Sequence, residues 1–211
     1  MAGAPASVLI GPAHDGTRMS LDEFADADVE PGYIYELEKG VIVVVDVPGV
    51  PYMLVRHAIR DALVDYKRKN PERIYAIADG SDAVMRMPEM ESERHPDISV
   101  YLTPPPVADA QPWEFWIPEI VVEVVTSQSR TRDYKIKPRE YLDAGVRLYW
   151  IIDPDRRMAV VLTRRADQWR EETFDATGRL TTALLPGFEL RLDAVFGVAG
   201  SLKTRRRPRR P

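Results

Sequence analysis

One carboxylate lies in the middle of an apolar stretch, residues 120–125, whose other members are all β-branched. Such a run is typical of a strand that is covered on both faces. Alternation along the strand would place Glu123 on the same face as Val121 and Val125. Because an unpaired buried charge is strongly unfavourable, Glu123 must pair with an Arg or Lys, reach solvent at a strand edge, or hold a cation.

A second carboxylate stands at the start of another apolar stretch. Asp97 follows Pro96 and precedes residues 98–102, and proline suits the first residue of a strand. If the two strands are neighbours, Asp97 and Glu123 can share a hard divalent cation, Mg²⁺ or Mn²⁺, which prefers oxygen ligands. Such an ion lowers the pKa of a bound water and neutralises charge on a phosphate that is being cleaved.

This chemistry also needs a cationic group that holds the attacking water or stabilises the transition state. Asp133, Lys137 and Tyr141 are spaced by four residues on one face of a predicted helix, with Lys135 nearby. The alternative interpretation of this charged stripe is the solvated surface of a helix.

Some other polar and aromatic residues have two possible roles. His95, directly before Pro96, could touch a phosphate or a metal-bound water, or be an ordinary polar loop residue. Trp113, Phe115 and Trp116 lie in a proline-rich stretch, residues 103–118. Their rings could stack on bases, or serve as core anchors or as an interface for a second subunit.

The elements that would position these residues begin with a short helix and a hairpin. Ser20 and Glu23 have the spacing of a capping box and predict a helix over residues 20–28. Two β-rich runs, residues 33–38 and 41–47, flank Lys39-Gly40 and predict a hairpin. Apolar residues at three- and four-residue spacing then predict a helix over residues 52–69.

The rest of the chain predicts a mixed sheet with one more helix. We expect strands at residues 73–78, 83–87, 98–102, 119–125 and 146–152, a helix at 133–144 that ends at Gly145, and a β-meander to about residue 192. This order predicts one α/β or α+β domain over residues 19–195, between a flexible N-terminus, residues 1–18, and a basic disordered tail, residues 196–211.

Composition excludes some chemistry and weakens one partner class. The absence of cysteine excludes disulfides, thiolate metal sites and cysteine nucleophiles. The formal net charge is -4, but six Lys and Arg residues between 203 and 211 leave about -10 on the rest. An acidic body binds nucleic acid weakly, since affinity for phosphate comes from Lys and Arg. The tail would either tether the chain to DNA or act as a solubilising terminus.

Neither a signal peptide nor a run approaching roughly 20 apolar residues is found in the sequence. We therefore expect a cytoplasmic protein that does not enter a membrane.

Many of the residues above belong to one ordered set. The set comprises residues 19–24, Tyr35-Glu36-Leu37, Gly40, Pro96-Asp97, Glu123, Ser129-Arg130, Asp133, Lys137, Tyr141, Gly145-Val146 and residues 149–153. It resembles the restriction endonucleases of the Uma-two family, in the PD-(D/E)XK nuclease superfamily, over roughly residues 19–160. The resemblance implies a restriction-endonuclease-like core, in which helices flank a mixed β-sheet.

The resemblance also implies an activity, a magnesium-dependent endonuclease that hydrolyses phosphodiester bonds in DNA. Asp97 and Glu123 would be metal ligands, the Val124 carbonyl would be a third, and Lys137 would orient the nucleophilic water. Glu36 would either add an acidic contact or face solvent. Because each chain would have one active site, double-strand cleavage would be simplest for a homodimer.

The sequence departs from the superfamily motif at its lysine. The motif places a lysine two residues after the glutamate, where this chain has Val125. In the family the lysine is taken to lie on the following helix, which nominates Lys137. The string Asp133-Tyr134-Lys135 matches the literal motif but lies in a polar stretch, so we expect it to be a decoy.

Pro138 is the second departure, because proline disfavours helical geometry in the residue before it. Either the helix begins late, so that Pro138 is a first-turn residue, or Lys137 points away from the site and Lys135 replaces it, or activity is lost. Three hypotheses follow: an active nuclease, a catalytically inactive nuclease-fold protein that acts by binding DNA or protein, and a structural dimerisation module.

Overall fold

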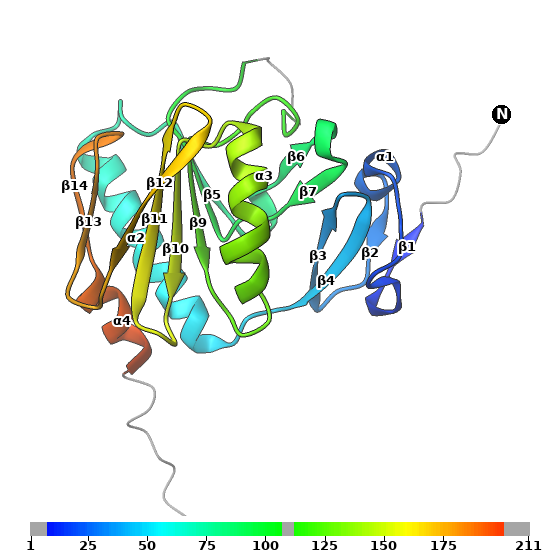
Figure 1. Cartoon of the computed structure of the whole chain (residues 1–211), viewed down its shortest axis with the longest axis horizontal. Coiled ribbons are helices and arrows are strands. Elements are labelled where there is room, and N and C mark those ends of the chain that lie inside the picture. Colours follow the sequence, from blue (N-terminus) through cyan, green and yellow to red (C-terminus); the bar gives the residue numbers. More distant parts are fainter. Residues whose placement is uncertain (1–7, 107–111, 201–211) are drawn as a thin grey trace, which may run out of the picture.

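The computed structural model describes residues 8–106 and 112–200 (Figure 1). Residues 1–7 of the expected flexible N-terminus, residues 107–111 of the proline-rich stretch and residues 201–211 of the expected basic tail lie outside the described residues. The remainder of the expected flexible N-terminus includes strand β1 (Leu9–Ile10) and a 3-10 turn, Pro12–His14. In the part of the chain that is described, no helix is both long and apolar enough to span a membrane.

A six-stranded mixed sheet forms the centre of the molecule, in the order β12-β11-β10-β9-β8-β5. Its strands are β5 (Ala76–Asp79), β8 (Ile98–Tyr101), β9 (Ile120–Val124), β10 (Leu148–Asp153), β11 (Met158–Arg165) and β12 (Gln168–Phe174). Strands β9 and β10 run parallel and are connected through helix α3 (Lys137–Ala144), whereas the other neighbours are antiparallel. This mixed sheet with helices confirms the predicted fold class.

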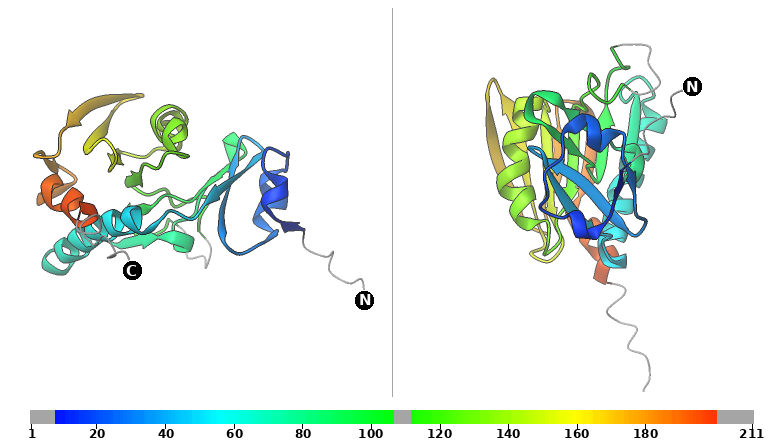
Figure 2. Two further views of the ribbon diagram at one scale, coloured as in Figure 1. Left: turned by 90° about the horizontal axis from the view of Figure 1, so that it is seen from below. Right: turned by 90° about the vertical axis from the view of Figure 1, so that its right-hand side faces the viewer.

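Helices cover both faces of this sheet (Figure 2). Helices α2 (Val50–Lys69) and α4 (Leu192–Gly200) lie on one side, and α3 lies on the other. Val122 and Val124 pack in the core beside α2, whereas Val121 and Val125 pack in the core that includes Tyr141 of α3. The predicted alternation is therefore confirmed, and it directs Glu123 towards α3.

A smaller antiparallel sheet lies beside the main one, in the order β4-β3-β7-β6. Its strands are β3 (Tyr33–Glu38), β4 (Val41–Asp46), β6 (Met85–Met87) and β7 (Ser92–Arg94). The predicted hairpin is confirmed, since β3 and β4 pair and both turn residues have positive φ, 51° at Lys39 and 73° at Gly40. Helix α1 (Leu21–Ala25) packs on this sheet behind the predicted capping box of Ser20 and Glu23. Strand β2 (Asp28–Val29) pairs with β1.

Three parts of the chain differ from the prediction. The strand expected at residues 83–87 belongs to the smaller sheet as β6. The expected β-meander is divided between two sheets. Strands β11 and β12 extend the main sheet, whereas β13 (Arg179–Thr182) and β14 (Leu185–Arg191) form a separate hairpin. The third is α4, which includes residues 196–200 of the expected disordered tail. This helix was not predicted because its stability comes from packing Leu192, Val195 and Phe196 into the α2-side core rather than from local signals.

Candidate active site

Asp97 and Glu123 lie side by side at the rim of the main sheet. Strands β8 and β9 are antiparallel and pair Ile98 with Val122. Asp97, directly before Ile98, therefore lies beside Glu123, directly after Val122. Oδ2 of Asp97 accepts a hydrogen bond of 2.7 Å from the Val124 N–H, and the Asp97 N–H donates a longer one, 3.4 Å, to Oε2 of Glu123. The structure thus brings together the two acids that the sequence singles out.

Glu123 is buried, with 4% of its surface exposed, and two groups of α3 donate to its Oε1. The Lys137 ammonium lies 2.8 Å from this oxygen and the Tyr141 hydroxyl 2.6 Å from it. Burial raises the pKa of Glu123 to about 8; Lys137 opposes the shift, whereas Asp133 and Asp97 add to it. The carboxylate therefore has a cationic partner, but its charge remains incompletely compensated.

Lys137 is surrounded by carboxylates from three parts of the chain. Besides Glu123, its ammonium lies 3.2 Å from Oε1 of Glu36 on β3 and 3.5 Å from Oδ1 of Asp133. Burial alone would lower the pKa of Lys137, but these three carboxylates outweigh burial and hold the pKa well above its usual value. Lys137 is therefore a permanently charged ammonium inside the protein.

A π-helical turn, Arg132–Ile136, precedes α3 and explains how Lys137 reaches the site. Lys137 is the first residue of α3 and keeps helical backbone angles, φ −57° and ψ −35°, although Pro138 follows it directly. Helical backbone begins at Arg130, earlier than the predicted start at residue 133, so the structure does not have the late helix start that Pro138 suggested. Lys135 is exposed on this turn and lies outside the cluster.

Asp133, which the sequence grouped with Lys137 and Tyr141 on one helix face, belongs to the cluster around Lys137. Its side chain is 1% exposed, its Oδ2 accepts a hydrogen bond of 2.5 Å from the Ser129 hydroxyl, and its Oδ1 is the oxygen close to Lys137. The polar sequence around it gave no sign of burial, because that burial depends on α3 docking against the sheet.

Glu36, for which the sequence left two roles open, is buried at 3% exposure. Its Oε2 accepts from Arg94 at 3.1 Å, and its Oε1 faces Lys137 and the His95 N–H. Burial raises the pKa of Glu36, but Lys137 and then Arg94 outweigh it and hold the pKa at about 2. Glu36 is therefore an ionised carboxylate that contacts two buried cations, Lys137 and Arg94.

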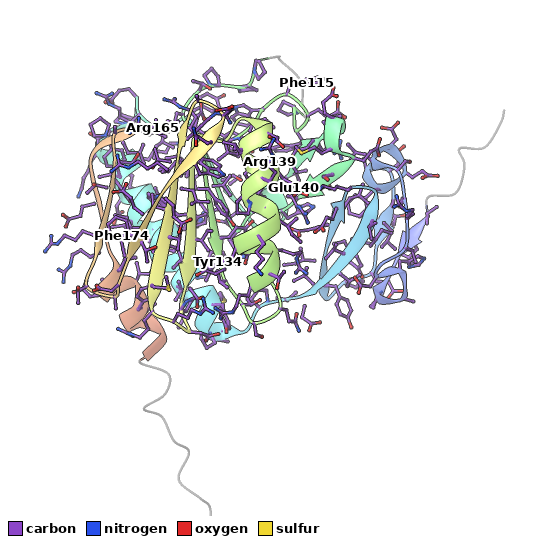
Figure 3. The ribbon with its side chains drawn as sticks, in the orientation of Figure 1. Phe115, Tyr134, Arg139, Glu140, Arg165 and Phe174 are labelled. Carbon is purple, nitrogen blue, oxygen red and sulfur yellow. The ribbon has the colours of Figure 1, made fainter. Side chains whose placement is uncertain are left out.

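Arg94 is a residue that the sequence analysis missed. Its side chain is fully buried and also binds Glu38 and Glu140, each by its NH2 group and at 2.9 and 2.8 Å respectively. Glu140 lies on the side of α3 that is turned towards β3 and β7 (Figure 3). Arg94 thus joins the smaller sheet to α3, directly behind Glu36.

Arg56 of α2, also missed, approaches the other side of Asp97. Its NH1 lies 3.7 Å from Oδ1 of Asp97, whose side chain is 20% exposed. Burial raises the pKa of Asp97 to about 6, while the Val124 N–H, Lys137 and Arg56 oppose the shift. Asp97 lines two cavities, of about 340 and 110 Å³, and the smaller one is also lined by Val124.

The remaining candidate residues, His95, Trp116 and Phe115, differ in their contacts and exposure. The imidazole Nε2 of His95 lies 3.2 Å from Oε1 of Glu93, and the ring also lines the larger cavity. Trp116 stacks on Tyr101 with ring centroids 3.8 Å apart and donates to the Thr103 carbonyl, so it is anchored to the protein. Phe115 is 60% exposed.

The carboxylate oxygens of Asp97 and Glu123 are of the kind that a hard divalent cation binds. Oδ1 of Asp97 has a single contact at 3.7 Å and Oε2 of Glu123 a single hydrogen bond at 3.4 Å, so each acid keeps one weakly engaged oxygen. Across residues 8–106 and 112–200, no three His, Asp or Glu side chains are grouped to hold a metal ion. Two carboxylates fit Mg²⁺, which commonly keeps several waters, and a cation would stabilise the ionised forms of two acids whose pKa values are raised mainly by burial.

Comparisons with known proteins agree with this architecture. A solved structure that matches is the "Crystal structure of a putative nuclease belonging to DUF820 from Anabaena variabilis ATCC 29413", with a TM-score of 0.71 and 18% identity over 86% of this chain and 99% of that chain. At this identity the likeness shows a common fold. No curated protein matches the chain.

A family model described as "Putative restriction endonuclease" matches residues 21–193. The match covers α1, both sheets and the whole cluster around Lys137, and it extends to the first residues of α4. The resemblance inferred from the ordered set of motifs is thereby confirmed, and the chain belongs to the Uma2 family of putative restriction endonucleases.

Proposed function

We propose that the protein is a metal-dependent endonuclease that hydrolyses phosphodiester bonds in DNA at Asp97 and Glu123. The observation that carries this proposal is the buried Lys137 ammonium, 2.8 Å from Glu123 at the sheet rim that Asp97 shares. Two acids and a lysine at one rim, open to cavities beside Asp97, provide ligands for a cation and a fixed positive charge for the reaction.

Asp97 and Glu123 would hold Mg²⁺ or Mn²⁺, with the Val124 carbonyl as a third protein ligand. When bound, the ion supplies Lewis acidity that activates a water and neutralises charge on the phosphate. Lys137 donates a hydrogen bond to the attacking water or to a phosphate oxygen. Tyr141 fixes the Glu123 carboxylate through Oε1, which leaves Oε2 for the ion.

Glu36 and Arg94 position the lysine from behind. Oε1 of Glu36 holds the ammonium from the side of the smaller sheet, and Arg94 keeps Glu36 ionised. A lysine clamped in this way stays protonated and needs little reorganisation during the reaction. A homodimer would place one such site on each strand of a duplex.

The test is conversion of supercoiled plasmid to nicked and linear forms with Mg²⁺ or Mn²⁺. Asp97→Asn and Glu123→Gln remove the charge of each ligand with little change in shape and should abolish cleavage. Asp143→Asn is the matched control, because Asp143 is a half-exposed carboxylate that pairs with Arg139 on the surface of α3. Cleavage by both site variants at the wild-type rate would rule out this site.

A catalytically inactive nuclease-fold protein that binds DNA or protein is the second candidate. This candidate is favoured by the three carboxylates that already surround Lys137, because they compete with a substrate for the hydrogen bonds that the ammonium can donate. Titration calorimetry separates the two. Absence of heat with Mg²⁺ and Mn²⁺, in a protein that unfolds cooperatively, would favour the inactive protein; binding that Asp97→Asn removes would favour the nuclease.

A further inference from the structure

The cavity of about 340 Å³ beside Asp97 is lined by both aromatic and polar residues. The aromatic residues come from α1 and β3 and are Phe24, Tyr33 and Tyr35. The polar lining includes Arg56, His95 and Asp97. We call this space the α1–β3 cavity. Its volume lies at the lower end of the range for small-ligand pockets, about 300–1,000 Å³.

The lining favours a flat, uncharged ring over an anion. Asp97 and Glu93 both border the α1–β3 cavity and would repel a phosphate, while Arg56 is already directed to Asp97. Aromatic rings contribute faces on which a heterocycle can stack.

Two buried donors lack partners in this region. Among the described residues, the Tyr35 hydroxyl and Nε of Arg56 are buried without a hydrogen-bond partner, although both residues line the cavity. Tyr35 is 5% exposed, so water does not compensate its hydroxyl freely. Buried polar groups of this kind are normally satisfied, and a small rotation of either side chain towards the cavity would let a ring nitrogen or oxygen atom of a nucleobase accept from it.

Asp97 borders both this cavity and the proposed hydrolytic centre. A strand whose phosphate lies at Asp97 and Glu123 would have a neighbouring base within reach of the cavity. A base that is paired and stacked in a duplex cannot enter without leaving the helix, which costs least when the nucleotide is already unpaired.

We propose that the α1–β3 cavity receives one unpaired nucleobase, so that the preferred substrate is single-stranded DNA or a duplex with an unpaired nucleotide at the cleavage position. This inference rests on the proposed nuclease function for its cleavage, but the base-binding cavity can be tested without it. The charge of the chain agrees with it. A body with a net charge of about -10 attracts the phosphate backbone weakly, so a contact to a base adds affinity that phosphates do not supply.

Binding is measured by fluorescence anisotropy in EDTA, where no metal-dependent cleavage occurs. The probes are a labelled single strand, the same sequence as a blunt duplex, and an abasic strand of equal length. The wild type should bind the single strand more tightly than either of the others. Tyr33→Ala, which removes a ring that is 40% exposed, should weaken binding of the single strand by about tenfold.

Ala27→Leu provides a second variant, because it adds volume at the cavity wall without removing any aromatic ring. It should weaken binding of the single strand and leave the abasic strand unaffected. Tyr75→Ala is the matched control, since Tyr75 is 50% exposed and lies outside the cavity lining. Thermal unfolding of each variant verifies that it is folded.

The outcomes distinguish this inference from the nuclease proposal. Equal affinity for the three probes, unchanged in Tyr33→Ala and Ala27→Leu, overturns the base-binding cavity even if plasmid is cleaved. Base-dependent binding that both variants lose supports the cavity even if no metal restores cleavage. With an active enzyme, a strand containing an unpaired nucleotide should be cut at least about tenfold faster than a blunt duplex, and equal rates overturn the substrate preference.

Discussion

The Lys137 ammonium lies 2.8 Å from Oε1 of Glu123, whereas Lys135, on the preceding turn, is exposed to solvent. The strand carboxylate therefore has its lysine partner on α3, whereas Val125 stands two residues after Glu123 on the strand side. The following predictions depend on this pairing and on the groups that support it.

Lys137→Met should reduce cleavage by at least about 100-fold, because a preorganised hydrogen-bond donor is lost from the site. Lys135→Met, which removes an equal charge from the same turn, should leave cleavage unchanged. Rates are measured on plasmid at a temperature at which circular dichroism shows both variants folded. The opposite result, an active Lys137→Met and an inactive Lys135→Met, would transfer the catalytic role to Lys135.

The stability of the metal-free protein should fall as the pH rises from about 4 to about 8. The pKa values of Asp97 and Glu123 are raised to about 6 and about 8 from ordinary values of 3.8 and 4.5, so the folded state holds more protons than the unfolded state across this window. Glu36, with a pKa of about 2, acts in the opposite direction, but only below its ordinary value of 4.5.

The same shifts predict that Mg²⁺ stabilises the protein more at pH 8 than at pH 5, since the ion must displace protons from both acids at the lower pH. Thermal unfolding with EDTA and with Mg²⁺, recorded across this range, measures both effects. A gain in melting temperature that does not depend on pH would exclude these two acids as the ligands.

Arg94→Met should destabilise the fold by about 3–5 kcal/mol, because it leaves buried carboxylates without their cation. Glu36, Glu38 and Glu140 all contact this guanidinium. The control is Arg139→Met, since Arg139 pairs with Asp143 at 73% exposure and such surface pairs contribute about 0–1 kcal/mol. Urea denaturation gives both free energies, and equal losses would contradict the buried network.

Pro138→Ala should lower the free energy of unfolding by no more than about 1 kcal/mol, because the backbone at this position is already helical and the proline acts mainly by restricting the unfolded chain. Cleavage should be retained, since Lys137 is oriented by its three carboxylates rather than by the ring of Pro138. Chemical denaturation and the plasmid assay measure the two quantities. A large gain of activity in Pro138→Ala would mean that the proline holds Lys137 away from its working position.

The sequence was most informative where local patterns determine structure. The buried strand around Glu123, the capping box at Ser20 and the hairpin turn at Lys39-Gly40 each have a short-range physical cause, and each is present in the structure. The pairing of Asp97 with Glu123 was predictable because Asp97 precedes one apolar strand and Glu123 lies within another, and one sheet can bring the two together.

The missed residues depend on contacts between distant segments. Arg94 lies in a charged stretch that has the composition of a surface loop, yet it is fully buried because three glutamates from β3 and α3 surround it. Arg56 was one of several charges on an amphipathic helix, and only the docking of α2 brings it near Asp97. The π-helical turn before Lys137 likewise has no local signal that separates it from the start of an α-helix.

Glu36 and Lys137 come from the smaller sheet and from α3, yet their side chains are 3.2 Å apart and both are buried. Neither half of the chain can therefore shelter the ammonium by itself. The two sheets also share apolar contacts, since Met85 and Met87 of β6 pack in the core that includes Val121 of β9 and Tyr141 of α3. Loss of either sheet would expose this cation to water.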